Sequence, residues 1–294
     1  MEIRVLRYFL TVVREESITK AADVLHITQP TLSRQLAQME EDMGIKLFDR
    51  GTRKIVLTNE GMLLRRRAEE ILELVDKTER ELTEQDETVE GTVSIGCGDL
   101  NAVQMLPDLI RTFHKRYPAV RFDLHTATAD HVRDRMERGL TDIGLLLEPI
   151  NMEKYDFTRL NQKEQWVVVM PNDSPLAEKR YVTPDDLKSV PLILPHRMNI
   201  QSELANWFGD SFEHLNIFFT SNLPANCAIM VYHNLAYAMI IEGSISLWDR
   251  KKITYRPLYP ELSASSVLAW RRQQPFGLAA SKFIEHMKDF DFNS

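Results

Sequence analysis

The chain has 294 residues, a length that suits a small domain joined to a larger one and excludes one ordinary core. Hydrophobic residues make up 44% and charged residues 27%. This composition is typical of a globular protein and excludes a low-complexity one. The net charge of −7 argues weakly against nucleic-acid binding, unless basic side chains gather on one surface.

The N-terminal sequence and the apolar runs indicate where the protein works. Residues 1–5 contain no basic stretch followed by a long apolar run, so we expect no secretory signal. No segment approaches the roughly 18 uncharged apolar residues that are needed to cross a bilayer. These features predict a cytoplasmic protein with no membrane partner.

The two cysteines, Cys97 and Cys227, lie far apart and fit no metal-ligand spacing. Two unpaired thiols in a reducing compartment are the simpler interpretation, and a redox switch is the alternative. We expect no metal and no cofactor.

The first 43 residues predict three helices. In the first helix, apolar residues recur at three- and four-residue steps and indicate one buried face, formed by Leu6, Phe9, Leu10 and Val13. Ser17 is a good N-cap for a short helix over 18–25. Thr28 is a plausible N-cap for a longer helix that runs to about Met43, with Pro30 in its first turn. A helix, a short helix, a tight turn and a longer helix form the helix-turn-helix pattern.

The second helix of such a motif enters the major groove with its N-terminal end. Its predicted inward residues are Leu32, Leu36 and Met39. Its outward side chains are polar: Gln29, Thr31, Ser33, Arg34, Gln35 and Gln38. The acidic residues 40–42 collect at the C-terminal end, away from the phosphates, which answers much of the objection from net charge.

A short hairpin is predicted next. The β-forming residues 55–57 follow a turn at 49–52, and Arg50, Arg53 and Lys54 cluster at this turn. Such a basic wing suits a phosphate backbone or a minor groove. A solvated hairpin is the alternative, but the attached helix-turn-helix favours the wing.

Residues 17–61 resemble the DNA-binding domain of LysR-type transcriptional regulators, through the pieces AAxxLxxxQPxLSRQ, LFDR and LTxxG. Glutamine pairs well with adenine and arginine with guanine, so the residue types fit direct readout of bases. The resemblance implies contacts to base edges from Gln29 and Pro30, to backbone or bases from Thr28, Ser33 and Arg34, and to phosphate or the minor groove from Arg53.

Residues 59–88 predict a linker helix with a heptad seam, formed by Leu64, Ala68, Ile71, Val75, Thr78 and Leu82. A helix this polar outside its seam gains little by folding alone, so we expect it to pair with the same helix of a second chain. Packing against its own domain is the alternative. Two recognition helices about one DNA turn apart can then read a two-fold site. The resemblance implies the same dimer, and often a tetramer.

Residues 89–294 alternate between strands and helices. Strands at 92–97, 120–127 and 141–148 flank helices at 100–117 and 131–139, which predicts a parallel sheet with right-handed crossovers. A second set then follows, with strands at 165–170, 192–194, 217–220, 237–241 and 266–271 and helices from 183, 201–208, 225–233 and 278–288.

The whole chain is therefore predicted as an α/β protein of three parts. These are a winged helix-turn-helix in residues 1–58, a dimerising linker helix in 59–88, and a two-lobed effector-binding domain in 89–294. The first lobe takes about 92–162 and 266–294, and the second about 163–265. The resemblance implies a domain similar to periplasmic binding proteins, which senses a small-molecule effector and adjusts binding to double-stranded DNA. RNA polymerase is a further candidate partner.

Ligands of such domains bind beyond the carboxyl ends of the strands, between the lobes. Loops at these positions give the candidate effector-binding residues Gly98, Asp99, Leu100, Asn101, Thr128, Met198, Asn199 and Asn222. Many LysR-type regulators carry serine or threonine in the first loop, where this chain has Gly98 and Leu100 beside Asp99. Because Asp99 would repel an anion unless it is paired, we hypothesise a neutral, cationic or amino-bearing effector in place of a small carboxylate.

Two other classes of protein fit less well. An enzyme with Cys97 as nucleophile needs a positioned base, and nothing in the sequence ties His114, His125 or His131 to this thiol. We find no phosphate loop, nucleotide fingerprint or metal-ligand cluster, so we expect no enzyme. A solute-binding protein conflicts with the missing export signal and with the helix-turn-helix.

Overall fold

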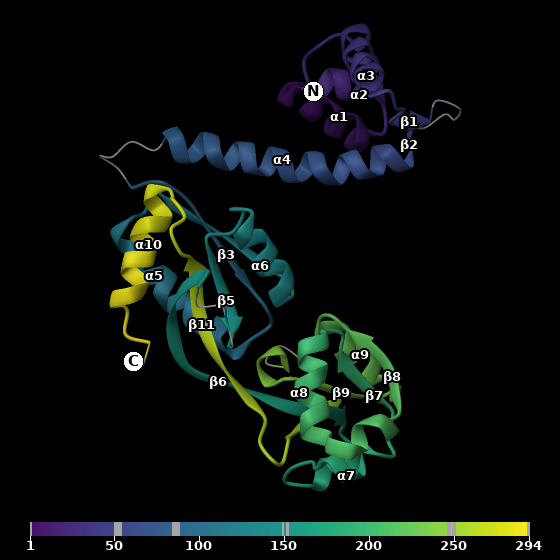
Figure 1. Ribbon diagram of the computed structural model, residues 1–294, viewed down its shortest axis with the longest axis vertical. Coiled ribbons are helices and arrows are strands. Elements are labelled where there is room, and N and C mark those ends of the chain that lie inside the picture. Colours follow the sequence, from purple (N-terminus) through teal and green to yellow (C-terminus); the bar gives the residue numbers. More distant parts are fainter. Residues whose placement is uncertain are drawn as a thin grey trace. The chain divides into compact units, whose positions relative to one another are not determined.

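The computed structural model describes residues 2–49, 55–83, 89–148, 150, 153–245, 248 and 251–292. The chain divides into two compact units, Met1–Thr83 and Glu84–Ser294 (Figure 1).

The described part of the first unit holds four helices and a short antiparallel hairpin: α1 (Ile3–Glu15), α2 (Ile18–Val24), α3 (Gln29–Met43), β1 (Phe48–Asp49), β2 (Val56–Leu57) and α4 (Asn59–Thr83). The predicted helix-turn-helix is confirmed. The Ser17 hydroxyl accepts the Lys20 N–H at the start of α2. Gly44 ends α3 with a φ of 65°, a conformation that glycine adopts at little cost.

The core of the first unit follows the predicted periodicity on α3. Leu32, Leu36 and Met39 are buried, and they share one apolar cluster with Phe9 of α1 and Phe48 of β1. The rings of Phe9 and Phe48 lie 5.4 Å apart, so the hairpin packs onto the first helix. This packing fixes α3 with its opposite face toward solvent.

The predicted seam on α4 is partly wrong. Ala68 is buried and Leu64 packs beside it, in the same apolar cluster as α1, so this side of the helix packs on its own unit. The buried stripe continues to Leu72, whereas Ile71 is 36% exposed. From Ala68, a step of three residues leads to Ile71 and a step of four to Leu72, which lie on opposite sides of Ala68 around the helix axis. The sequence pattern followed the first step, whereas the buried stripe follows the second.

The second unit is built on one nine-stranded mixed sheet in the order β4-β3-β5-β11-β6-β9-β7-β8, with β10 paired to β6. The strands are β3 (Gly91–Cys97), β4 (Val120–Thr126), β5 (Ile143–Leu147), β6 (Tyr155–Pro171), β7 (Leu192–Pro195), β8 (Ile217–Ser221), β9 (Tyr237–Ile241), β10 (Ile253–Pro257) and β11 (Ser263–Arg271). The helices are α5 (Leu106–Arg116), α6 (Ala129–Glu137), α7 (Pro184–Leu187), α8 (Met198–Phe208), α9 (Ala225–Tyr232) and α10 (Leu278–Asp289), with 3-10 segments η1 (Asn101–Met105), η2 (Pro175–Glu178), η3 (Gly209–His214) and η4 (Glu242–Ile245).

Two lobes share this sheet. Lobe I contains β3, β4, β5 and most of β11, and lobe II contains β7, β8, β9 and β10, as Figure 1 shows. The strand β6 runs through both lobes, because Leu160 lies in the core of lobe I and Trp166 in a core of lobe II. Each lobe therefore has its own apolar core, and β6 with the start of β11 connects them.

Two predictions about these elements are wrong. The strand expected at 165–170 begins ten residues earlier, at Tyr155, and β10 was not predicted. The parallel sheet expected for the strands at 92–97, 120–127 and 141–148 is confirmed, because β3 pairs in parallel with both β4 and β5. The complete sheet is mixed, since β6 and β11 run antiparallel to each other and to their neighbours. The α-helix expected from residue 100 starts as the 3-10 segment η1. Pro107, in the first turn of α5, has no N–H to donate to a carbonyl group of η1, so the α-helical hydrogen bonds do not extend back into that segment.

Candidate functional site

The N-terminal half of α3 presents a polar surface. Thr28, Gln29, Pro30, Arg34 and Gln38 are exposed, and Thr31 and Ser33 are half-buried. Short hydrogen bonds hold two of these pairs in place: the hydroxyls of Thr28 and Thr31 lie 2.8 Å apart, and the Gln29 amide donates to the Ser33 hydroxyl at 2.8 Å. The predicted DNA-contacting side chains on this helix are therefore wholly or partly open to solvent. The predicted wing residues Arg50, Arg53 and Lys54 lie outside the described residues.

Glu40 does not behave as the solvated acid that the sequence suggested. It is 1% exposed, and one carboxylate oxygen accepts the N–H groups of Leu47 and Phe48 at 2.8 and 3.4 Å. Burial opposes ionisation, but these two N–H groups and Lys46 outweigh it and hold the pKa of Glu40 below its ordinary value. Glu40 thus joins the end of α3 to β1.

An open pocket lies between the two lobes. The space between its walls measures about 770 Å³, part of it open to solvent. Five of the predicted effector-binding residues line it: Gly98, Asp99, Leu100, Thr128 and Asn222. Asn101 and Met198 are not among the lining residues that the structure describes, and Met198 is 75% exposed to solvent. The side chain of Asn199 lies outside the described residues.

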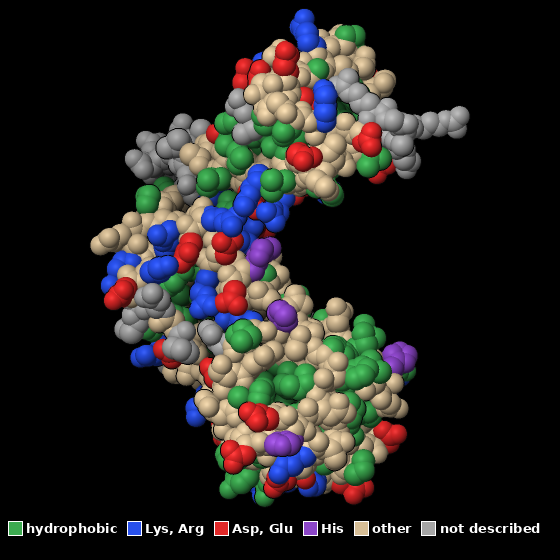
Figure 2. Space-filling model, turned by 45° about the vertical axis from the view of Figure 1, so that its right-hand side comes forward, with side chains coloured by type: hydrophobic (Ala, Val, Ile, Leu, Met, Phe, Trp, Pro, Cys, Tyr) green, Lys and Arg blue, Asp and Glu red, His purple; other side chains and the backbone are tan. Residues whose placement is uncertain are grey.

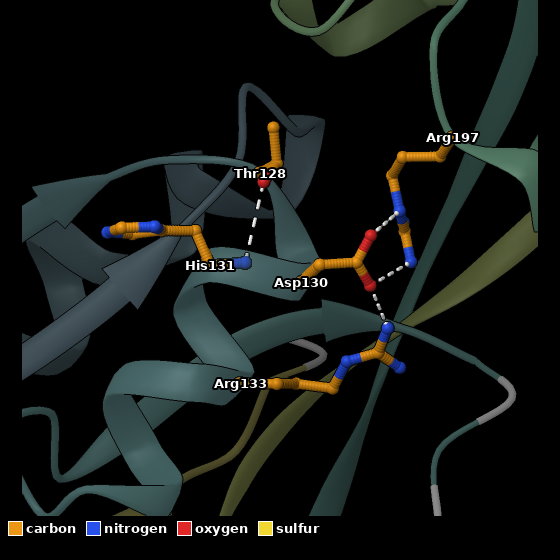
Figure 3. A network of polar contacts seen from close by, with 5 residues as sticks. All are labelled: Thr128, Asp130, His131, Arg133 and Arg197. Atoms are coloured by element: carbon orange, nitrogen blue, oxygen red, sulfur yellow. Dashed lines mark hydrogen bonds and ion pairs between the residues drawn. The ribbon is translucent and has the colours of Figure 1, made fainter.

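An ion pair joins the two lobes beside this pocket. Arg197, which precedes α8 in lobe II, donates to the two oxygens of Asp130 in α6 of lobe I, at 2.7 and 2.9 Å (Figure 3). Arg133 binds the same carboxylate from within α6. The Arg197 contact, followed by the Arg133 contact, holds the pKa of Asp130 below its ordinary value. One carboxylate therefore serves two guanidinium groups.

A second carboxylate lies fully buried where β6 passes between the lobes. Glu164 is 0% exposed and accepts the backbone N–H groups of Asn101 and Ala102, both at 2.9 Å, and the Ser266 hydroxyl at 3.1 Å. The two N–H groups open η1, where the backbone dipoles favour a negative charge. The Glu164 carboxylate is thus the anion bound at the start of η1.

Asp99 differs from these two acids. It is half-buried and lines the pocket, and no residue that the structure describes forms a hydrogen bond or ion pair with its carboxylate. Burial raises the pKa of Asp99 above its ordinary value. Charge on this carboxylate is therefore less stabilised than on Asp130.

The sequence of each unit matches a known domain. Residues 3–62 match the profile of the bacterial regulatory helix-turn-helix protein of the lysR family, and residues 86–291 match the LysR substrate binding domain. The chain belongs to the LysR family. It is a LysR-type DNA-binding transcription regulator with a substrate-binding domain, which confirms the resemblance, fold class and function predicted from the sequence.

Relatives span the chain. The HTH-type transcriptional regulator BsdA of Bacillus subtilis is 33% identical over 218 residues, which cover 74% of each protein. The Hca operon transcriptional activator HcaR of Escherichia coli is 27% identical over 283 residues, or 92% of each protein. The structure of CbnR with its target DNA has a TM-score of 0.74 at 20% identity and covers 98% of this chain and 99% of CbnR, so it shows a shared fold. A point mutant of full-length BenM has a TM-score of 0.54 at 27% identity and covers 98% of this chain and 96% of BenM.

Several residues of this LysR-type regulator were missed by sequence reasoning. Arg197 lies in the predicted cleft loop, where its charge was a usable signal, but Met198 and Asn199 were chosen instead. Glu164 precedes the predicted strand, and only its position in the longer β6 places it between the lobes. Apolar residues such as Trp166 and Ile240 line the pocket, but in the sequence they look like ordinary residues of buried strands.

The described cysteines, metal-binding side chains and helices indicate no second functional site. Burial raises the pKa of both Cys97 and Cys227, which disfavours the thiolate that a redox switch needs. In the part of the chain that the structure describes, no group of three metal-binding side chains converges. None of the described helices combines the length and apolarity of a membrane span.

Proposed function

We propose that this LysR-type regulator binds a two-fold operator as a homodimer, or as a tetramer of two dimers, in the cytoplasm. The observation that carries the proposal is the polar, solvent-facing N-terminal half of α3 on a buried helix-turn-helix core. RNA polymerase is the partner through which bound protein would alter transcription.

Direct readout is assigned to the exposed side chains of α3. The Gln29 amide has the donor and acceptor that pair with adenine, and the Arg34 guanidinium has the two donors that pair with guanine in the major groove. Pro30, Thr28 and Ser33 lie around them on the same end of the helix. Gln38 lies further along and binds Asp42 at 2.9 Å, so we assign it a contact at the edge of the interface. Arg50, Arg53 and Lys54 would add phosphate contacts from the wing.

A second copy of the chain is the proposed partner of the exposed side of α4. Leu63, Ile71 and Leu74 are 55%, 36% and 43% exposed, and their spacing of eight and three residues puts them on one face. Exposed apolar side chains at such spacing favour helix pairing. Figure 2 shows green areas on the face of lobe II. The exposed apolar side chains of this lobe include Ile217, Phe218, Ile229 and Tyr232.

The pocket between the lobes is the proposed effector site. Its walls come from both lobes, so a bound molecule contacts lobe I and lobe II at once. An effector that binds one arrangement of the lobes more tightly shifts the population toward that arrangement. The altered effector domains would then change how the paired helix-turn-helix units lie along DNA.

The test is binding of the full-length protein to the promoter region upstream of its own reading frame, beside a scrambled duplex, at two salt concentrations. We expect tighter binding to the promoter, weaker at high salt, because phosphate contacts release counterions. Arg34→Ala should lower the affinity about fivefold or more, since one bidentate base contact contributes about 1–3 kcal/mol.

Arg14→Ala is the matched control, because Arg14 is an exposed arginine on α1 that pairs with Glu15. It should leave operator binding unchanged. Equal binding to the promoter and the scrambled duplex, followed by failure of a random-sequence selection to enrich any site, would contradict the proposal.

A further inference from the structure

The pocket between the lobes has mainly apolar walls. Leucines of lobe I line one wall, and Trp166 with aliphatic residues of lobe II lines the other; they include Leu100, Leu146, Leu147, Ile240 and Ile241. Apolar walls of this extent favour a ligand whose body is itself apolar, because binding removes both surfaces from water. The polar side chains of the lining then determine which functional group the ligand carries.

Two positively polarised positions near the pocket already hold carboxylates of the chain. The Arg197 guanidinium donates to both oxygens of Asp130, and the first N–H groups of η1 donate to the buried Glu164. An incoming carboxylate would have to displace Asp130 from Arg197, or approach Glu164 as a second negative charge. Both routes cost electrostatic energy that a ligand without negative charge avoids.

Asp99 is the contrasting position. Asp99 is one of the residues that line the pocket, and none of the described residues pairs with its carboxylate. The neighbouring lining residues Gly98 and Leu100 contribute no hydroxyl group that would donate to it. A partly desolvated carboxylate without a partner gains most from a cation, which supplies charge and hydrogen-bond donors together.

We infer that the effector is an apolar amine, with its hydrocarbon or aromatic body against the Leu146 and Trp166 walls and its ammonium group at Asp99. This inference rests on the proposed function, because it concerns the ligand of the same pocket. The burial that raises the pKa of Asp99 supports it, since a bound ammonium group would reverse that effect. The pocket thereby discriminates against simple carboxylates.

The experiment is isothermal titration of the full-length protein with matched probes that differ in one group. Tryptamine, tryptophol and indole-3-acetate share an indole ring and carry an amine, an alcohol and a carboxylate. Phenethylamine and octylamine, each with its matched alcohol and carboxylate, extend the panel to smaller and more flexible bodies. We expect an amine to bind at least tenfold more tightly than its alcohol, and the carboxylate to bind most weakly.

Asp99→Asn should lower the affinity of the best amine to that of its alcohol. Asp123→Asn is the matched control, because Asp123 is an exposed aspartate of β4 outside the pocket lining, and it should leave amine binding unchanged. A carboxylate that binds as tightly as its amine overturns the inference. So does an unchanged amine affinity in Asp99→Asn, or a panel in which no amine binds.

Operator binding measured on the same samples separates the two proposals. A protein that binds its operator but prefers carboxylates contradicts the effector class alone. A protein that binds amines at Asp99 but shows no preference for any DNA sequence contradicts the proposed function alone.

Discussion

The Asp130 carboxylate in lobe I holds the Arg197 guanidinium of lobe II through two hydrogen bonds of 2.7 and 2.9 Å. The two residues are 67 positions apart in the sequence, and each belongs to a segment that begins a helix beside the pocket. Parallel, charge-assisted bonds fix the orientation of both partners. The pair therefore joins the lobes at the mouth of the pocket.

We expect Asp130→Asn to shift the lobes toward a more open arrangement. An exposed ion pair contributes about 0.2–1 kcal/mol, so the shift should be up to about fivefold in the population of open molecules. Pulsed EPR distances between labels at Lys115→Cys in lobe I and Glu203→Cys in lobe II measure it, in labelled protein diluted with unlabelled chain. Asp134→Asn, which loses a pair with Arg138 at the end of α6 inside lobe I, is the control and should leave the distances unchanged.

The same measurement has a defined pH dependence. Because Arg197 and Arg133 lower the pKa of Asp130, its carboxylate stays charged as the pH falls to the ordinary aspartate value of about 3.9. The distances should therefore change only below that pH, as the proton binds and the pair is lost. Opening that begins near pH 6 would mean that another group controls the lobes.

Glu40→Gln should destabilise the helix-turn-helix unit by about 1.5–3 kcal/mol, because hydrogen bonds to a buried charged group are lost or weakened. The pKa of Glu40 is lowered in the folded protein, so its contribution is present above the ordinary carboxyl range and disappears as the pH falls through the lowered value. Thermal unfolding at pH 7 and at low pH checks both points. Glu41→Gln, at an exposed neighbouring acid, should have little effect at either pH.

Replacing Ile71 and Leu74 together by glutamate should dissociate the proposed dimer, since two charges would enter an apolar helix interface. Analytical ultracentrifugation measures the change in mass. Met62→Glu makes a similar substitution at an exposed apolar residue outside the Leu63, Ile71 and Leu74 face, and it should preserve the dimer. A double variant that sediments like wild type would place the interface elsewhere.

Gly243→Ala should disturb the junction between η4 and η1. A Cβ atom at this position would lie 2.0 Å from the Asn101 nitrogen and 2.5 Å from the Leu100 carbonyl carbon, and both are backbone atoms. Overpacking of this kind costs about 1–3 kcal/mol, so the melting temperature of the effector domain should fall. Gly98→Ala is the control for stability, because its added Cβ would meet only ordinary contacts at 3.8 Å.

Periodic features of the fold were predictable from sequence. Leu32, Leu36 and Met39 recur on one face of a helix, and this local pattern alone determines which side of α3 is buried. The strand at 143–147 is similarly readable, because residues that are buried on both faces form a continuous apolar run. Such signals lie within one element and need no knowledge of its neighbours.

Pairings between distant polar residues were not predictable. From sequence, Glu40 is one of three consecutive acids at the end of a helix. Only the fold shows that the N–H groups of Leu47 and Phe48 donate to its carboxylate. Glu164 finds its partners about 60 residues before it and about 100 after it, which no period in the sequence encodes. The pocket was also only partly predictable. The loops that line it were predicted from topology, whereas the ion pair of Arg197 depends on how the lobes meet.

The passage of β6 and β11 between the lobes determines how an effector signal can travel. Both connections are hydrogen-bonded strands of one sheet, registered at Gln165 with Ser263 and at Lys163 with Ser265. A rotation of one lobe against the other must therefore twist this two-stranded ribbon, and the elastic energy rises continuously with the angle. An effector shifts the population toward a turned arrangement only if its greater affinity for that arrangement exceeds the energy of twisting the ribbon.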